Sequence, residues 1–279
     1  MAPSRVRVPG WPGLRYHSLE VKRLAWLLLN GLQAVFLVSW TAFWVTAVLV
    51  VRVLTGGPKL PLTIARKVWL PVALWTVGAR LEVDISPLND FSKPALFVAN
   101  HRSFYDIPAL VGAVPTNLHF LAKKEVRKIP FLGLYAAAMG MVFIDRADSA
   151  ASRTSVDHMS LLLEEGASMA SYPEGTRSRS GDLLPFKTGS FVAAIKAGVP
   201  VVPVSISGSE KVLPSDGFSP RPGLIRVSIG EPIPTTQMDL EERRKLADEA
   251  RDQVGEMLQL AEGHRDAERG LETTAPSEL

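Results

Sequence analysis

The chain has 279 residues, of which 47% are hydrophobic and 21% charged, and its formal net charge is +3. It contains no cysteine, which excludes disulfides and thiolate metal sites. The length suits one large domain or two small ones.

The charges are unevenly distributed along the chain. Residues 1–80 contain ten Lys or Arg and one acid, Glu20, whereas residues 239–279 contain twelve acids and six bases. A basic segment beside an apolar run indicates an anionic lipid surface as a partner. Nucleic acid is not expected as a partner, because we find no arginine-rich recognition helix and no interleaving of aromatic and basic residues on a strand.

Two apolar segments occupy the first part of the chain. Residues 24–51 carry no charge and are long enough to cross a bilayer core, which needs about 20 apolar residues. Residues 61–78 are moderately polar and suit an interfacial amphipathic helix. We expect a membrane-associating helix pair with breaks at Gly31 and Gly56-Gly57-Pro58, either as a hairpin in one leaflet or with one full span. The alternative is that both segments are core helices of a soluble domain.

Beyond residue 80, short apolar runs alternate with amphipathic stretches. This alternation predicts an α/β domain with a mostly parallel core sheet flanked by helices. We therefore divide the chain into a membrane-associating segment (1–80), a catalytic domain (81–262) and a disordered polar tail (263–279). Strands are expected at 81–85, 94–99, 118–122, 140–144, 167–172, 199–206 and 225–229, and helices at 107–111, 130–135, 149–165, 188–197 and 239–262.

A histidine and an aspartate follow the expected strand at 94–99. Asp106 lies five residues after His101, close enough for a turn to fold its carboxylate onto the imidazole. A carboxylate there would fix the tautomer of His101 and stabilise its charged form. His101 is therefore a candidate general base, although the spacing alone also fits a capped loop.

Two further expected strands end in polar clusters. Asp145 and Arg146 follow the strand at 140–144, and Glu174, Thr176 and Arg177 follow the strand at 167–172. The carboxyl ends of parallel neighbours meet at one edge of a sheet, so we expect these clusters to converge with the first. The two guanidinium groups suit a phosphate dianion, although each arginine alone also fits a surface ion pair.

Four segments in this part of the chain resemble, in order and in spacing, the four motifs of the glycerolipid acyltransferases. The resemblance covers roughly residues 80–232 and points to the 1-acylglycerol-3-phosphate O-acyltransferase (lysophosphatidate acyltransferase) family. Tyr172 stands where the family more often has Phe. The segments are Asn100-His101-Arg-Ser103-Phe-Tyr-Asp106, Gly140-Met-Val-Phe143-Ile144-Asp145-Arg146, Tyr172-Pro173-Glu174-Gly175-Thr176-Arg177-Ser178 and Val201-Val202-Pro203-Val204.

The resemblance implies transfer of a fatty acyl group from acyl-CoA or acyl carrier protein to the sn-2 hydroxyl of 1-acyl-glycerol-3-phosphate, giving phosphatidic acid in phospholipid biosynthesis. His101 would be the base and Asp106 would orient it, with no covalent acyl-enzyme, no metal and no other cofactor. We expect a monotopic or single-span protein at the cytoplasmic face of the cell membrane. The substrate-binding residues implied are Arg146, Glu174, Gly175, Thr176, Arg177, Pro203 and Lys123, of which Lys123, like its neighbour Lys124, is a weaker phosphate ligand.

Three alternatives compete with this interpretation. The acceptor could be another lysolipid or a glycolipid alcohol, because the motifs define the chemistry better than the head group. A metal-dependent hydrolase could use His101, Asp106 and Glu174, but metal sites usually recruit more than one histidine, and the other four have no ligand-like spacing. A non-catalytic membrane scaffold would leave the polar strand ends unexplained.

Overall fold

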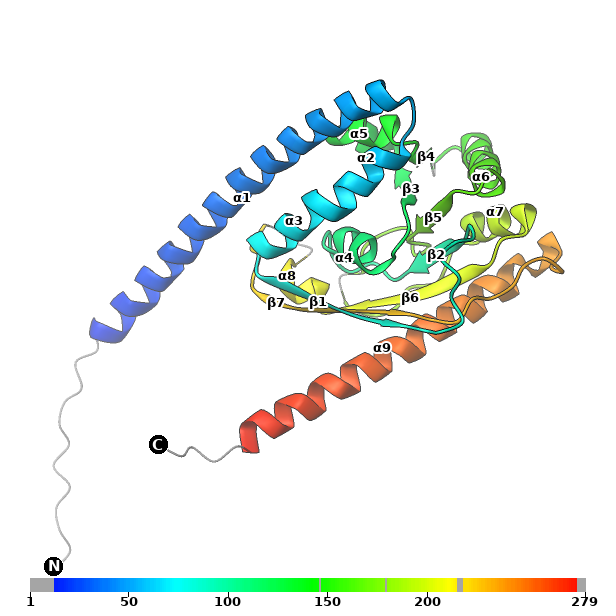
Figure 1. Cartoon of the computed structure of the whole chain (residues 1–279). Coiled ribbons are helices and arrows are strands. Elements are labelled where there is room, and N and C mark those ends of the chain that lie inside the picture. The colour runs from blue at the N-terminus through cyan, green and yellow to red at the C-terminus, as the bar shows by residue number, and fades with distance from the viewer. Residues whose placement is uncertain (1–12, 146, 179, 215–217, 275–279) are drawn as a thin grey trace, which may run out of the picture.

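A seven-stranded sheet with helices on both faces forms the centre of the protein (Figure 1). The computed structural model describes residues 13–145, 147–178, 180–214 and 218–274. The strand order is β1-β7-β6-β2-β5-β3-β4. The strands are β1 (Ala79–Ile85), β2 (Leu96–Ala99), β3 (Leu118–Lys123), β4 (Val142–Ile144), β5 (Ser168–Ser171), β6 (Val201–Ser207) and β7 (Gly223–Ile229).

All neighbouring strands pair in parallel except β6 and β7, which are antiparallel. The predicted α/β fold with a mostly parallel sheet is therefore confirmed. β2 lies between β5 and β6 and is buried along its whole length, as its continuous apolar sequence predicts. β1 lies at one edge of the sheet and β4 at the other.

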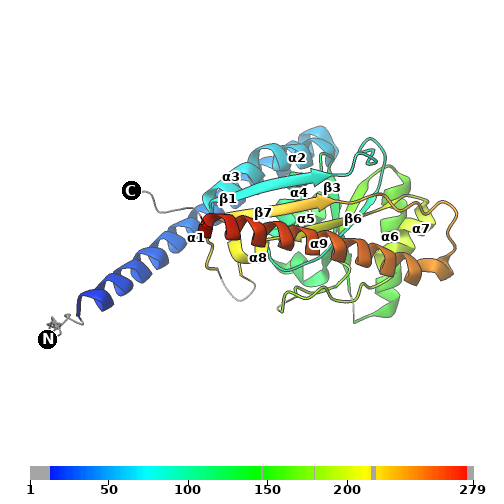
Figure 2. The same ribbon diagram turned by 90° about the horizontal axis from the view of Figure 1, so that it is seen from below.

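Helices cover both faces of the sheet. Leu96 and Val98 of β2 pack against α6, α7 and α9, whereas Phe97 and Ala99 pack in a second core that includes α3 and α4. Figure 2 shows α9 lying across one face, with α2 and α3 on the other side of the sheet. The helical segments are α1 (Gly13–Thr55), α2 (Lys59–Ile64), η1 (Ala65–Trp69), α3 (Leu70–Thr76), α4 (Asp106–Ala113), η2 (Lys124–Lys128), α5 (Leu132–Ala138), α6 (Ser149–Glu164), α7 (Gly189–Ala197), α8 (Ser209–Val212), η3 (Leu240–Glu242) and α9 (Arg243–Thr274).

The amphipathic helices each bury an apolar stripe against the sheet. Met159 and Leu163 of α6 are fully buried, and so are Ala250 and Val254 of α9. The tail expected to be disordered from Gly263 onward is helical as far as Thr274. Residues 263–274 include two Glu, two Arg, one Ala and one Leu, which favour a helix, and they extend a helix that is already nucleated on the core.

The N-terminal part is one long helix followed by a shorter, segmented one. The predicted break at Gly31 is wrong, because α1 continues through it: one glycine costs only about 1 kcal/mol in a helix. The chain turns at residues 56–58, where Gly56 adopts a φ of 69°. Residues 59–76 then run back beside α1 (Figure 1), and Gln33 Nε2 donates to Thr76 O across 2.8 Å.

The second segment belongs to the same core as the sheet. Leu70, Leu74 and Val77 pack with residues of β2, β6 and β7, and Tyr105 donates from its hydroxyl to Ala73 O. The boundary predicted at residue 80 therefore falls inside β1, and the hydrophobic core crosses it.

The first segment, in contrast, is largely exposed. Residues Arg23–Thr55 of α1 form a helix that is long and apolar enough to cross a membrane. Leu32 and Val53 on this helix are 70% and 81% exposed. This exposed apolar surface is consistent with membrane association.

Candidate active site

The loops that follow β2 and β5 meet at the carboxyl edge of the sheet. The two strands are hydrogen-bonded neighbours, with Val98 opposite Ser171. Ser178 N donates to His101 O across 2.8 Å and joins the two loops directly. The predicted convergence of the first and third polar clusters is thus observed. Asp145 follows β4 at the far end of the sheet, and Arg146 lies outside the described residues.

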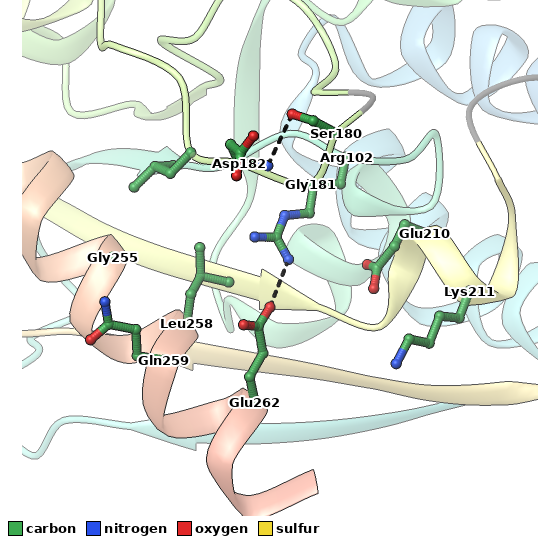
Figure 3. Close-up of a pocket in the computed structure, with 11 residues that line it drawn as sticks. Arg102, Ser180, Gly181, Asp182, Glu210, Lys211, Gly255, Leu258, Gln259 and Glu262 are labelled. Atoms are coloured by element: carbon green, nitrogen blue, oxygen red, sulfur yellow. Dashed lines mark hydrogen bonds and ion pairs between the residues drawn. The ribbon is translucent and has the colours of Figure 1, made fainter. Parts of the chain in front are cut away.

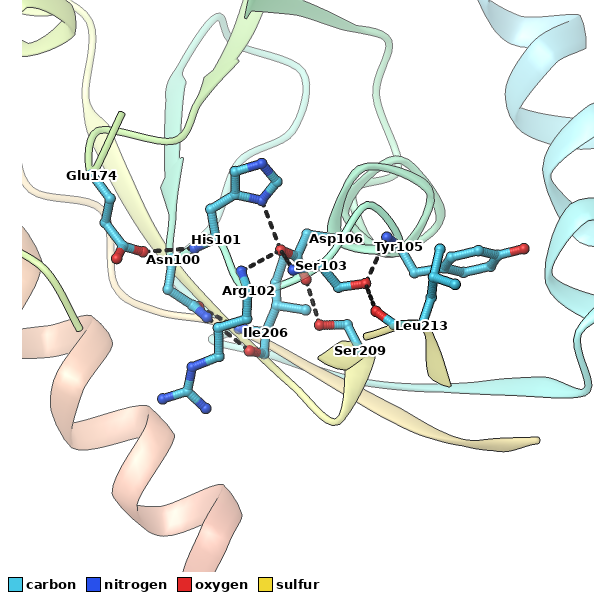
Figure 4. A network of polar contacts seen from close by, with 10 residues as sticks. All are labelled: Asn100, His101, Arg102, Ser103, Tyr105, Asp106, Glu174, Ile206, Ser209 and Leu213. Carbon is cyan, nitrogen blue, oxygen red and sulfur yellow. Dashed lines mark hydrogen bonds and ion pairs between the residues drawn. The ribbon is translucent and has the colours of Figure 1, made fainter. Parts of the chain in front are cut away.

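His101 and Asp106 form a hydrogen-bonded pair in this loop (Figure 4). His101 Nδ1 lies 2.8 Å from Asp106 Oδ2, and the carboxylate belongs to the first turn of α4 and is fully buried. A carboxylate only accepts hydrogen bonds, so Nδ1 carries the proton and Nε2 is the ring atom that can accept another. The histidine side chain is 17% exposed, which leaves it in reach of a substrate.

The Asp106 carboxylate is fixed by more than the histidine. Its Oδ2 also accepts the backbone N–H groups of Arg102 and Ser103 at 2.7 and 2.8 Å. Its Oδ1 accepts the hydroxyl of Ser209, a fully buried residue at the start of α8. Four donors therefore surround one carboxylate, and this arrangement orients it rigidly against the imidazole.

Sequence analysis did not single out Ser209. The residue follows the end of β6, the strand beside β2, so the same strand-end rule could have found it. Gly208 before it has a φ of 88°, and a Cβ there would lie 2.2 Å from Leu224 O. Only glycine suits this turn, which directs Ser209 toward Asp106.

Other polar residues of the loop have structural roles. Asn100 bonds the backbone of Ile206 twice, at 2.9 and 2.7 Å, and so ties the end of β2 to β6. Ser103 donates from its hydroxyl to Leu213 O across 2.7 Å. Both side chains are buried, and these bonds fix the backbone that carries His101.

Glu174 lies beneath the loop that carries His101. One carboxylate oxygen accepts His101 N at 2.6 Å, and the other accepts Leu184 N at 3.0 Å. The side chain is 4% exposed, and burial raises its pKa, while the two backbone donors partly counteract this effect. The carboxylate thus joins the loop after β2 to the loop after β5, a structural role that the sequence did not predict.

Tyr172 packs its ring against the imidazole. The ring centroids of His101 and Tyr172 are 4.2 Å apart and the planes differ by 20°. The tyrosine hydroxyl is buried and finds no hydrogen-bond partner among the described residues. Burial, and secondly the charge of Asp106, raises its pKa well above the usual value. The ring rather than the hydroxyl makes the contact with His101, so a phenylalanine could make the same contact.

Arg177 lies beside the histidine loop. Its guanidinium carbon is 3.8 Å from the centroid of the Phe104 ring, and Phe104 is itself 57% exposed. Thr176 is exposed in the same loop, and Gly175 before it has a φ of 78°. Phe104 and Thr176 therefore expose side chains near the His–Asp pair.

The remaining predicted residues lie farther along the sheet or within it. Lys124 forms an ion pair with Asp145, which raises the pKa of the lysine and lowers that of the aspartate. Lys123 pairs with Glu125 at 3.5 Å, and both are exposed. Pro203 is buried in β6 opposite Val98, inside the sheet rather than in an edge loop.

A groove of about 630 Å³ opens beside the loop that carries His101 and Arg102 (Figure 3). It lies between the loop that contains Asp182 and the helix α9, and Arg102 reaches across it to Glu262 at 3.1 Å. Acidic and basic side chains both line it. Within the described part of the chain, no group of three His, Asp or Glu side chains is arranged to hold a metal ion.

Most of the sheet and the His–Asp pair at its carboxyl edge lie in the part of the chain that places it in the class of acyltransferases. The sequence model of the family described as Acyltransferase matches residues 80–207, which include β1 to β6 and both members of the pair.

Curated relatives narrow the class. The chain is 34% identical over 224 residues to the chloroplastic 1-acyl-sn-glycerol-3-phosphate acyltransferase BAT2 of Brassica napus, a match that covers 76% of this chain and 63% of that protein. It is 30% identical over 237 residues to the 1-acyl-sn-glycerol-3-phosphate acyltransferase of Saccharomyces cerevisiae, covering 82% and 77%. The chain belongs to this family of acyltransferases. It spans about half to two thirds of the length of the first curated relatives, 63% and 53% for two plant proteins.

A solved structure agrees with this assignment. The crystal structure of the 1-acyl-sn-glycerophosphate (LPA) acyltransferase PlsC from Thermotoga maritima matches with a TM-score of 0.71 and 29% sequence identity. The match covers 84% of this chain and 97% of that one.

Proposed function

We propose that this protein transfers a fatty acyl group from an acyl thioester to the sn-2 hydroxyl of 1-acyl-sn-glycerol-3-phosphate, giving phosphatidic acid. The observation that carries the proposal is the 2.8 Å contact between His101 Nδ1 and Asp106 Oδ2 at the sheet edge of a chain of this family. The names of the relatives supply the acceptor. The donor is acyl-CoA or acyl carrier protein.

The proposed reaction needs one base and no covalent intermediate. His101 Nε2 takes the proton of the acceptor hydroxyl while the oxygen attacks the thioester carbonyl. The new C–O bond forms, the tetrahedral oxyanion collapses, the C–S bond breaks and the thiolate takes the proton from the imidazolium. Asp106 stabilises the imidazolium throughout. General-base assistance of this kind contributes about 10²–10⁴-fold in rate.

Acceptor recognition is assigned to the loop after β5. Arg177 would pair with the phosphate through its fork of donors, and the exposed Thr176 beside it would add a hydroxyl contact. Gly175 would allow close approach of the backbone, and Arg146 would bind the same phosphate. Glu174 would support the loop rather than meet an anion, since both of its oxygens accept backbone N–H groups.

The remaining assignments are weaker parts of the same proposal. Lys123 would add positive potential near the phosphate, and Pro203 would shape the sheet behind the acyl side. The protein would sit at the cytoplasmic face of the cell membrane as a monotopic or single-span protein, because its acceptor is a lipid and its donor is water-soluble.

A labelled transfer assay tests the function. Purified full-length protein is given radiolabelled acyl-CoA or acyl carrier protein together with lysophosphatidate, lysophosphatidylcholine or lyso-ornithine lipid. We expect labelled phosphatidic acid and little transfer to the other acceptors. Faster transfer to another acceptor would support acyl transfer but show that lysophosphatidate is not the preferred acceptor. No transfer from either donor would contradict the proposal.

A further inference from the structure

An apolar groove of about 440 Å³ lies where the end of α1 meets α5. One wall is formed by the last turns of α1, and the other by Phe131 and Leu134 at the start of α5. Arg52 Nε donates to Ala138 O at 3.2 Å and holds the two helices together. The exposed apolar surface of α1 therefore continues onto the sheet domain without interruption. The α1 side chains that line the groove are Thr46, Leu49, Val50, Val53 and Leu54.

The residues before α5 expose apolar side chains in an unusual way. Ile129, Phe131, Leu132 and Leu134 are 47%, 56%, 42% and 60% exposed. This set, here called the 129–134 turn, exposes more large apolar surface than is usual for so short a loop in a soluble protein. No other described element packs over these side chains to bury them.

The 129–134 turn is built to hold this geometry. Phe131 is the one described residue other than glycine with a positive φ, 59°. A hydrogen bond from Gly133 N to Ile129 O at 2.8 Å closes the turn, and a Cβ at position 133 would lie 2.2 Å from Arg127 O. Positive φ costs a phenylalanine free energy that the fold must supply elsewhere. The turn thus keeps Phe131 outward at an energetic cost.

Basic residues immediately precede the turn in the sequence. Residues 123–128 contain four Lys or Arg and one acid, and Arg127 and Lys128 immediately before the turn are exposed. Lys59, at the start of α2 just after α1 ends, is exposed as well. An apolar tip bordered by cations matches an anionic bilayer, where the tip enters the acyl boundary and the cations meet head groups. A protein partner would not require both features side by side.

We infer that the 129–134 turn is a second membrane contact, which inserts into an anionic bilayer beside the end of α1. The inference rests on the proposed association of α1 with the same membrane. It implies that the sheet domain is docked on the bilayer at two points rather than tethered by one helix. Two contacts fix the orientation of the sheet edge that carries His101 relative to the bilayer. A single attachment point would leave the sheet domain free to rotate.

A site-specific label tests this contact in the full chain. The protein has no cysteine, so Phe131→Cys provides a single position for an environment-sensitive fluorophore. Leu161→Cys on α6 is the matched control, because Leu161 is also an apolar residue that is 56% exposed, and it lies on a different helix. Both labelled proteins are bound to mixed phosphatidylcholine–phosphatidylglycerol vesicles. Each is then exposed to aqueous iodide or to a quencher attached to lipid acyl chains.

We expect the label at position 131 to lose most of its iodide quenching on vesicles and to be quenched from the acyl chains, while the label at 161 stays open to iodide. Equal iodide quenching at both positions would overturn the inference. The protection of the label at 131 from iodide should not depend on the number of protein chains per vesicle. If it disappears when vesicles hold fewer than one chain on average, a second copy of the protein covers the turn, and this result would also overturn the inference. Leu134→Cys, at 60% exposure, repeats the test if Phe131→Cys does not fold.

Two further readouts separate this inference from the proposals on which it rests. Co-sedimentation of the protein with vesicles reports whether α1 associates with the membrane at all. Acyl transfer to detergent-dispersed lysophosphatidate reports the proposed activity and should be equal in the two labelled proteins. A protein that sediments and is active, but leaves position 131 open to iodide, would contradict only the second contact.

Discussion

Ser209 and Asp106 meet in the buried interior behind His101. The serine hydroxyl donates to Oδ1 of the carboxylate, whereas His101 occupies Oδ2. The loop after β6 therefore fixes the carboxylate that holds His101 in the loop after β2. Because neither Ser209 nor Asp106 is accessible to solvent, the contact acts on substrate only through the histidine.

The first prediction follows from this contact. Ser209→Ala removes one donor and leaves a buried carboxylate oxygen with an unmet hydrogen bond, which costs about 1–3 kcal/mol. We expect kcat to fall by roughly tenfold while KM for both substrates changes little, because the serine touches neither. Steady-state kinetics of the purified variant provides the check.

A matched control is available on α6. Ser160 is also buried and donates its hydroxyl within the protein, but at a distance from the loops of the sheet edge. Ser160→Ala should leave kcat within about twofold of the unchanged protein. Equal losses in the two variants would mean that hydroxyl deletion acts through stability alone.

The second prediction concerns the pair itself. His101→Ala should lower turnover by at least about a hundredfold, the size of general-base assistance, without unfolding the protein. Asp106→Asn should be similarly damaging, because a neutral amide cannot stabilise the imidazolium and offers one acceptor oxygen where the carboxylate offers two. Activity and circular dichroism are measured on the same samples. A folded His101→Ala protein with near-normal turnover would contradict the mechanism.

The third prediction concerns phosphate recognition. Arg177→Ala should raise the KM for lysophosphatidate by roughly ten- to a hundredfold, since a charge-assisted hydrogen bond contributes about 1.5–3 kcal/mol. Arg146→Ala should act in the same direction and less strongly. The KM for the thioester donor should move much less.

The stacking partner of Arg177 offers an additional comparison. Phe104→Ala removes the ring beneath the guanidinium and keeps the charge. We expect a smaller rise in the acceptor KM than in Arg177→Ala, because the cation remains but is less well held. If the arginine variants raised only the donor KM, the phosphate assignment would be wrong.

The fold could be predicted from the sequence because its signals are local. The uniformly apolar run before Ala99 predicts a central buried strand, and the strand-end histidine follows from the rule for parallel sheets. The role of Ser209 could not be predicted, because its partner Asp106 is distant in the sequence. Glu174 was expected to bind substrate, because charged residues in loops usually face solvent, but its carboxylate binds the backbone. Both roles depend on which strands are neighbours in the sheet. The periodicity of apolar residues in the sequence does not reveal that order. The break expected at Gly31 is absent because one glycine costs about 1 kcal/mol, too little to end a helix of 43 residues.

The fourth prediction concerns the tyrosine beside the histidine. Tyr172→Phe removes a buried hydroxyl that lacks a partner among the described residues and keeps the ring stacked on His101. We expect unchanged or slightly higher stability, by up to about 1 kcal/mol, and activity within a few-fold. Tyr172→Ala should instead lose activity, because the imidazole loses its packing surface. Thermal unfolding and kinetics of both variants distinguish the ring from the hydroxyl.

The last prediction concerns attachment to the membrane. The α1 residues Leu27, Leu32 and Val35 are 61%, 70% and 67% exposed, and burying each fully in lipid would contribute about 1.5–3 kcal/mol. Each neighbouring cation contributes about 1 kcal/mol, and salt screens it. Apolar burial therefore dominates, and the protein should stay in membranes through a high-salt wash and leave them in detergent. Release by salt alone would contradict an embedded α1.

The structure also determines how a truncation must be made. Removing residues 1–80 would take Leu70, Leu74 and Val77 out of the core together with the start of β1, so lost activity would report unfolding. Removing only residues 1–55 deletes α1 and keeps these side chains. We expect this shorter variant to lose more activity toward lysophosphatidate in vesicles than toward the same lipid in detergent. Equal losses in the two assays would show that α1 supports the fold rather than access to the bilayer.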